Sequence, residues 1–141
     1  MTWANLYERD GVVVGRQVTE GLGDESGYFV IADTDFQRFK VTLFPTDEGT
    51  VSVSLSAPMS ARPDQLANFT HDIPTYCGPE DTLAVGDDGL LTALAKPPYS
   101  AIDFRAGFTV QLPAVAVPAL RFAIEAAFAE AKDKAARNAS G

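Results

Sequence analysis

The sequence predicts an α+β fold, in which an antiparallel β-sheet of five to six strands is covered by a C-terminal α-helix. Neighbouring segments between residues 38 and 56 alternate hydrophobic and polar residues, with the period of two that a half-buried strand requires. The segment 118–137 is rich in alanine and carries a hydrophobic stripe at helical spacing. With 141 residues, the chain is expected to form a single domain over 1–141, with residues 138–141 as a frayed tail.

The N-terminal part is predicted to contain a short helix followed by two strands. Trp3, Leu6 and Tyr7 have helical spacing, and Gly11 is suited to end a short amphipathic helix. The next segment, GVVVGRQVTE, predicts a strand because consecutive valines favour the pleated conformation. After the polar loop GLGDESG, the apolar run YFVIA at 28–32 predicts another strand.

The clearest pattern is a hairpin formed by RFKVTLF at 38–44 and TVSVSLS at 50–56. Hydrophobic residues alternate at Phe39, Val41 and Leu43 and again at Val51, Val53 and Leu55. The other face is expected to carry Arg38, Lys40 and Thr42 and the serines Ser52, Ser54 and Ser56. The intervening PTDEG is predicted to be the turn. This part of the sheet should therefore have one hydrophobic face and one polar face.

The remaining segments predict a short helix, further strands and the terminal helix. RPDQLANFTHD predicts a helix near 63–72, with Pro63 in its first turn. TLAVGDDGLLTALA predicts a second hairpin, in which Asp88-Gly89 supplies the positive backbone angle of the turn, and IDFRAGFTVQL predicts one more strand. Only the terminal helix is long enough to cover the sheet, and its stripe consists of Leu120, Ile124, Ala127, Phe128 and Ala131.

This order of elements and the acidity of the chain resemble those of type III secretion chaperones and the related YbjN-type domains, which are small, acidic and often dimeric. The resemblance covers most of the chain and consists of element order and charge, without a diagnostic motif. The resemblance is therefore an analogy of fold and not an identification of the family.

Charge and composition restrict the class of partner. Nineteen acidic and eleven basic residues give a net charge of −8, which repels nucleic-acid phosphates and anionic lipids and attracts a basic partner. No apolar run is long enough to cross a bilayer. A single cysteine and the absence of a secretory signal predict a reducing, cytoplasmic location.

The only histidine and the only cysteine, His71 and Cys77, lie in THDIPTYC, which is predicted to be a loop. A nucleophilic thiolate needs a base within contact distance, and zinc needs three or four suitable ligands. The sequence offers neither a third catalytic group nor a ligand set, so no catalytic residue, metal or cofactor is predicted. Asp33, Asp35 and the GDDG at 86–89 are interpreted as turn residues.

The sequence therefore predicts a non-enzymatic acidic protein-binding domain, such as a chaperone, an immunity protein or an inhibitor, that acts on a basic partner. The predicted partner-binding residues lie in acidic loops: Asp24, Glu25, Asp47, Glu48, Asp87 and Asp88. A homodimer is also expected, either through the small side chains Ala123, Ala126, Ala127 and Ala131 or through an unpaired outer strand.

Two alternatives remain open. A single-stranded nucleic acid would bind the polar face of the sheet if Arg16, Arg38 and Lys40 lie there beside Tyr28 or Phe36. A small enzyme would act through Cys77 and His71, if the fold brings the thiol and the imidazole together.

Overall fold

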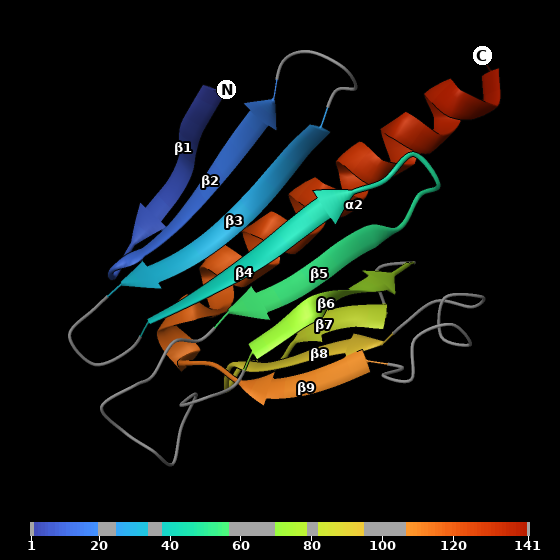
Figure 1. Cartoon of the computed structure of the whole chain (residues 1–141). Helices are drawn as coiled ribbons and strands as arrows, with labels where there is room; N and C mark the ends of the chain where they lie inside the picture. The colour runs from blue at the N-terminus through green and yellow to red at the C-terminus, as the bar shows by residue number, and fades with distance from the viewer. Residues whose placement is uncertain are drawn as a thin grey trace.

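The computed structural model describes residues 2–19, 25–33, 38–56, 70–78, 82–94 and 107–140. In these ranges the chain forms two antiparallel sheets and a long C-terminal helix (Figure 1). The first sheet contains β1 (Thr2–Arg9), β2 (Val12–Thr19), β3 (Glu25–Asp33), β4 (Arg38–Pro45), β5 (Val51–Ser56) and β6 (Thr70–Cys77), in that order. The second sheet contains β7 (Leu83–Val85), β8 (Leu90–Leu94) and β9 (Gly107–Gln111), and a short 3₁₀ turn then leads into α2 (Val117–Ser140).

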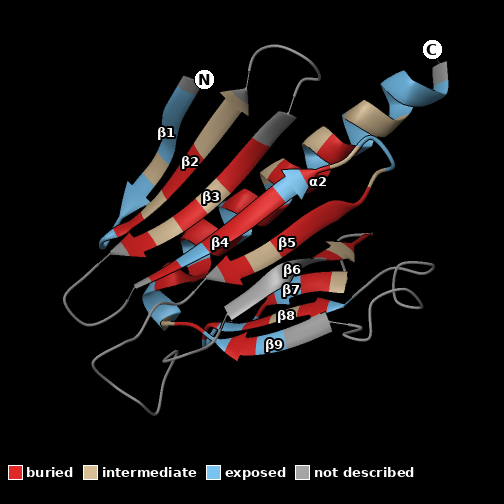
Figure 2. Ribbon diagram, viewed as in Figure 1, coloured by how far each residue is buried: buried red, intermediate tan, exposed pale blue. Residues whose placement is uncertain are grey.

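The helix α2 lies behind the six-stranded sheet and also contacts β7 of the three-stranded sheet (Figure 1). All five residues of the predicted hydrophobic stripe are buried, and Figure 2 shows the buried positions running along the strands and the helix. The prediction of an α+β fold with a covering C-terminal helix is therefore confirmed. The prediction of one sheet is wrong, because the second hairpin and the last strand pair with each other instead of extending the first sheet.

Both predicted hairpins are confirmed. In β4 and β5 the hydrophobic set Phe39, Val41, Leu43, Val51, Val53 and Leu55 is buried, as the alternation requires. In the β7–β8 turn, Gly89 adopts φ 95° and its N–H donates to the Gly86 carbonyl at 2.9 Å. A left-handed conformation of this kind is costly for any residue with a Cβ atom.

The predicted N-terminal helix is wrong, because Trp3, Leu6 and Tyr7 lie in the strand β1. A bulge between Asn5 and Tyr7 shifts the register with β2, so that Trp3 and Tyr7 lie on opposite faces of the sheet. The same spacing of hydrophobic residues fits a helix and a bulged strand. Asp10 and Gly11, at φ 54° and 80°, form a two-residue hairpin turn instead of a helix end.

The segment THDIPTYC is not a loop but the edge strand β6. Leu55 pairs with His71 and Val53 with Thr75, so residues 53–55 of β5 lie opposite residues 71–75 of β6. Pro74 lies at this irregularity, where a missing backbone N–H costs little. Thr70–Asp72 therefore belong to a strand and not to the helix predicted near 63–72, while residues 63–69 lie outside the described residues.

The buried contact of α2 with the sheets predicts a strong effect of Leu120→Ala. Leu120 is 0% exposed, and alanine keeps the helix propensity while it removes the buried isobutyl group. We expect the free energy of unfolding to fall by about 2–5 kcal/mol in urea denaturation followed by circular dichroism. Leu94→Ala, at a leucine that is 52% exposed, is the matched control and should cost much less. Equal losses for the two variants would contradict the packing described above.

Candidate functional site

The six-stranded sheet has an open face, defined here as the face turned away from α2. Phe29 lies between the buried residues Tyr28 and Val30, and Phe44 follows the buried Leu43, so both rings project from the open face. Trp3 joins them from β1, and it is 44% exposed, whereas Phe44 is 39% exposed. Side chains of this size are normally buried, so their exposure on one face marks a candidate contact surface.

Trp3, Phe29 and Phe44 form a continuous cluster, called here the aromatic row. The ring centroids of Trp3 and Phe29 are 5.6 Å apart, and those of Phe29 and Phe44 are 6.0 Å apart. The second pair is edge-to-face at 85°, which is a favourable geometry for aromatic rings. The cross-strand pairs Phe44–Ser52 and Ser52–Tyr76 continue the row to the half-buried Tyr76 on β6.

Two glycines within strands provide the space for these rings. A Cβ atom on Gly15 would lie 1.9 Å from the indole of Trp3, and one on Gly27 would lie 2.5 Å from the ring of Phe44. Each ring therefore occupies space next to a glycine, and the side chain of a larger residue at that glycine would displace the ring. Sequence reasoning missed this site, although a glycine inside each of two strands was the available signal.

Uncharged polar groups surround the aromatic row. The indole Nε1 of Trp3 donates to Asn5 Oδ1 at 2.7 Å. Thr42 and Ser54 continue the cross-strand line that begins at Phe29, and Lys40 is exposed further along β4. Thr42 is buried, at 7% exposed, so the polar side chains at the surface near the rings are those of Asn5, Ser54 and Lys40.

The acidic residues that the sequence nominated do not form one patch. Asp47 and Glu48 are exposed in the β4–β5 turn, where Gly49 approaches Ala135 near the end of α2. Asp87 instead forms an ion pair with Arg121, in the first turns of α2, at 2.6 Å. Residues 121 and 135 are 14 positions apart, which corresponds to about 21 Å along a helix.

The other three acidic residues that were predicted to bind a partner, Asp88, Glu25 and Asp24, do not lie together in an exposed loop. The Asp88 carboxylate accepts a hydrogen bond from the Leu90 N–H at 3.1 Å, so it stabilises the β7–β8 turn. Glu25 begins the strand β3 and is not part of a loop. Asp24 lies outside the described residues.

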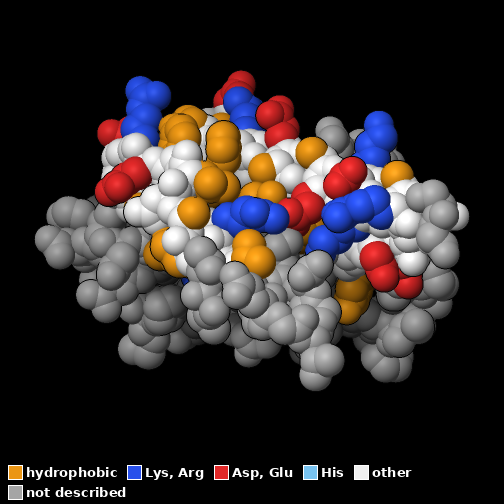
Figure 3. All heavy atoms as spheres, turned by 90° about the horizontal axis from the view of Figure 1, so that it is seen from above, with side chains coloured by type: hydrophobic (Ala, Val, Ile, Leu, Met, Phe, Trp, Pro, Cys, Tyr) orange, Lys and Arg blue, Asp and Glu red, His pale blue; other side chains and the backbone are white. Residues whose placement is uncertain are grey.

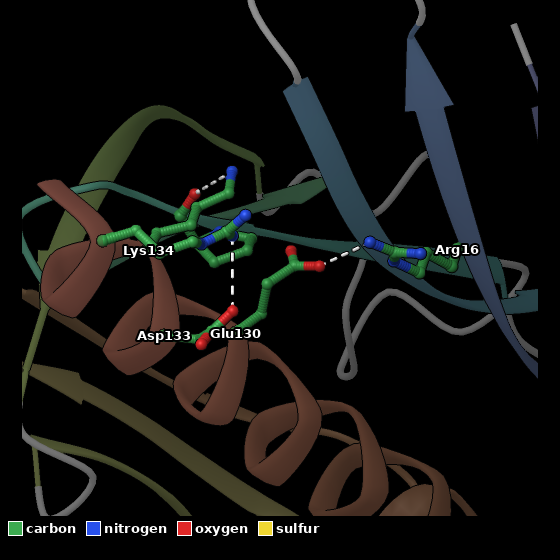
Figure 4. Close-up of polar contacts among 6 residues, drawn as sticks. Arg16, Glu130, Asp133 and Lys134 are labelled. Atoms are coloured by element: carbon green, nitrogen blue, oxygen red, sulfur yellow. Dashed lines mark hydrogen bonds and ion pairs between the residues drawn. The ribbon is translucent and has the colours of Figure 1, made fainter. Parts of the chain in front are cut away.

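Arg16 and Tyr28 lie on the face that meets α2, not on the open face. Arg16 Nη2 donates to Glu130 Oε1 at 2.5 Å, and its guanidinium lies 5.8 Å from the centre of the Tyr28 ring. Figure 4 shows this pair spanning from the sheet to the helix, close to the bond from Lys134 Nζ to the Pro45 carbonyl. Burial, and then Glu130, raise the pKa of Tyr28.

This placement corrects the set of residues nominated for nucleic-acid binding. Arg16 and Tyr28 connect the sheet to the helix, so they are not part of a polar stacking surface. Lys40 is exposed on the open face, as that interpretation requires. The side chain of Arg38 and the whole of Phe36 lie outside the described residues.

Cys77 does not have the environment of a nucleophilic thiolate. Its side chain is 0% exposed, and burial raises the pKa of the thiol to about 12. Cys77 pairs with Val51 and His71 pairs with Leu55, so the backbones of Cys77 and His71 are separated by four residues of β5, about 13 Å. A direct contact between imidazole and thiol requires a much shorter separation.

Nothing in the described ranges groups three or more histidine, cysteine, aspartate or glutamate side chains in the way that a metal site requires. The helix that the structure describes is too polar to span a bilayer. Comparison with known proteins found no family model, no curated protein and no solved structure that matches the chain.

The buried state of Cys77 predicts slow reaction with a thiol reagent at neutral pH. A pKa of about 12, against an ordinary value of 9.0, lowers the thiolate fraction about a thousandfold, and burial adds a steric barrier. We expect the labelling of Cys77 to become fast only in denaturant. A thiol reagent that releases a chromophore on reaction allows the rate to be measured by absorbance. In a Cys77→Ala background, Leu94→Cys supplies an exposed control thiol that should react quickly without denaturant. Fast labelling of native Cys77 would support the enzyme hypothesis instead.

Proposed function

We propose that this protein is a non-enzymatic, acidic protein-binding domain that holds its partner on the open face of the six-stranded sheet. The observation that carries the proposal is the aromatic row, where Trp3 and Phe44 are 44% and 39% exposed and are fixed in place by Phe29. Large aromatic side chains contribute much of the energy of protein interfaces when a partner excludes water from them.

The geometry of the rings favours a protein over a single-stranded nucleic acid. Successive bases stack on rings that expose their faces, whereas Phe29 and Phe44 meet at 85° and cover part of each other. A protein side chain can fill the angular space between such rings. The net charge of −8 also opposes binding to phosphates.

The charge supports a basic partner, in the manner of a chaperone, an immunity protein or an inhibitor. The negative electrostatic potential of an acidic protein accelerates its encounter with a cationic protein, even when the contact itself is apolar. In this arrangement the aromatic row provides affinity, and exposed carboxylates such as Asp47 and Glu48 provide long-range attraction. Nucleic-acid binding is the second candidate, favoured by the exposure of Lys40 on the same face.

An affinity pull-down from the source cells at low and high salt tests this proposal. We expect a basic protein to be captured and its binding to weaken as salt screens the charges. The double variant Trp3→Ser/Phe44→Ser should lose at least about 2 kcal/mol of binding free energy, about 30-fold in Kd. Isothermal titration with the captured protein measures this loss.

Leu90→Ser/Leu94→Ser is the matched control, because these leucines are 39% and 52% exposed on the second sheet. Binding should survive in this control. If the two double variants lose the same binding free energy, or if both keep it, the aromatic row is not the binding surface and the proposal is wrong. Nucleic acid in the captured material, lost after nuclease treatment, would instead select the second candidate.

A further inference from the structure

The open face carries a second line of side chains that crosses the strands beside the aromatic row. Glu8 of β1 pairs with Val13 of β2, and Val13 pairs with Ile31 of β3. Ile31 in turn pairs with Lys40 of β4. Residues that pair across strands project from the same face of a sheet, and Lys40 is exposed on the open face. All four side chains therefore lie on the open face, and we call them the charged row.

The two ends of the charged row have opposite charges, and its centre is aliphatic. Glu8 and Lys40 are exposed, whereas Val13 and Ile31 are half-buried. Three strand spacings of about 4.8 Å separate the backbones of Glu8 and Lys40, so these backbones are about 14 Å apart. Neither Glu8 nor Lys40 forms an ion pair with another residue that the structure describes. Both charges are therefore available to a bound molecule.

The charged row and the aromatic row form one continuous surface. Ile31 follows Phe29 by two positions on β3, which is about 7 Å along a strand. Val13 precedes Gly15 by two positions on β2, and the indole of Trp3 lies against Gly15. A partner that covers Trp3 and Phe29 therefore also reaches the charged row.

The net charge of the molecule does not by itself orient a partner. Figure 3 shows charged side chains of both signs among hydrophobic ones when the molecule is seen from above. Some of these charges are neutralised within the chain, as in the pairs of Arg16 with Glu130 and of Arg121 with Asp87. The long-range field attracts a basic protein, but contacts at short range must select its direction.

We propose that the charged row sets the direction in which a partner segment lies on the open face, an inference that rests on the function proposed above. The segment crosses from β1 to β4, with a lysine or arginine at Glu8 and an aspartate or glutamate at Lys40. Apolar side chains between these two residues cover Val13 and Ile31. A segment that lies in the reverse direction brings like charges together, which opposes its binding.

The opposite charges of this row favour a polypeptide over a nucleic acid. Phosphates repeat the same negative charge along a strand, so a nucleic acid that follows the row from Lys40 meets the carboxylate of Glu8. A polypeptide can place a cation and an anion at the required separation. In an extended segment, about 14 Å corresponds to about four residues.

Selection of random peptides displayed on phage against the full-length protein tests this proposal without a known partner. We expect the enriched peptides to contain a basic and an acidic residue about four positions apart, with apolar residues between them. An enriched peptide is then titrated by fluorescence anisotropy. Replacing its basic residue by glutamine should weaken binding to the wild type about fivefold, the effect of a partly exposed ion pair, but should not weaken binding to Glu8→Gln. Lys40→Gln should remove the effect of the acidic residue in the same way.

Glu125→Gln and Lys132→Gln are the matched controls, because they make the same changes at exposed residues of α2, on the other side of the sheet. In these variants the peptide substitutions should still cost about fivefold. Enriched peptides without the charge pattern, or an equal cost in Glu8→Gln and Glu125→Gln, would overturn the role of the charged row. The proposed function would stand in that case if Trp3→Ser/Phe44→Ser still abolished peptide binding.

Two other results would contradict more than the direction of the segment. If no peptide is enriched, or if enriched peptides bind Trp3→Ser/Phe44→Ser as tightly as the wild type, both this inference and the proposed function are wrong. A single-stranded oligonucleotide that binds more tightly than the enriched peptide, and that loses affinity in Lys40→Gln, would assign the row to nucleic acid and also overturn the inference.

Discussion

The close approach of α2 to both sheets is the contact on which the rest of the structure depends. Ala119, Ala123, Ala127 and Ala131 are at most 1% exposed, and their small side chains let the helix lie near the strands while Leu120 fills the space between. A helix packed in this way covers one face of the six-stranded sheet. The helix leaves the opposite face of this sheet uncovered, and Trp3 and Phe44 are 44% and 39% exposed on it.

Polar contacts orient the helix that the hydrophobic core holds. Glu130 accepts a charge-assisted bond from Arg16, and Lys134 reaches the carbonyl of Pro45, so two points on α2 are fixed to two different strands. The arrangement has a cost, because the buried Arg16 Nε finds no hydrogen-bond partner among the described residues. Apolar packing is compatible with more than one rotation of a helix, whereas these directional bonds favour one.

The surface has separate regions with different chemistry. The open face presents the exposed rings of Trp3 and Phe44, and Phe122 is exposed on α2. Acidic side chains are distributed over turns at both ends of α2, so they do not form one continuous patch. These regions do not share residues, so each can be substituted separately.

The sequence by itself determined the elements whose signals are local. Alternation predicted the 38–56 hairpin, Asp88-Gly89 predicted the next turn, and the stripe from Leu120 to Ala131 predicted the covering helix. Tertiary structure decided the rest. The bulge in β1 places Trp3 and Tyr7 on opposite faces of the sheet, although their spacing is helical. Arg16 forms an ion pair with Glu130 of α2. Strand pairing brings Trp3, Phe29 and Phe44 together. These outcomes depend on contacts between residues far apart in the chain, and a one-residue shift in strand register reverses the face of every side chain that follows.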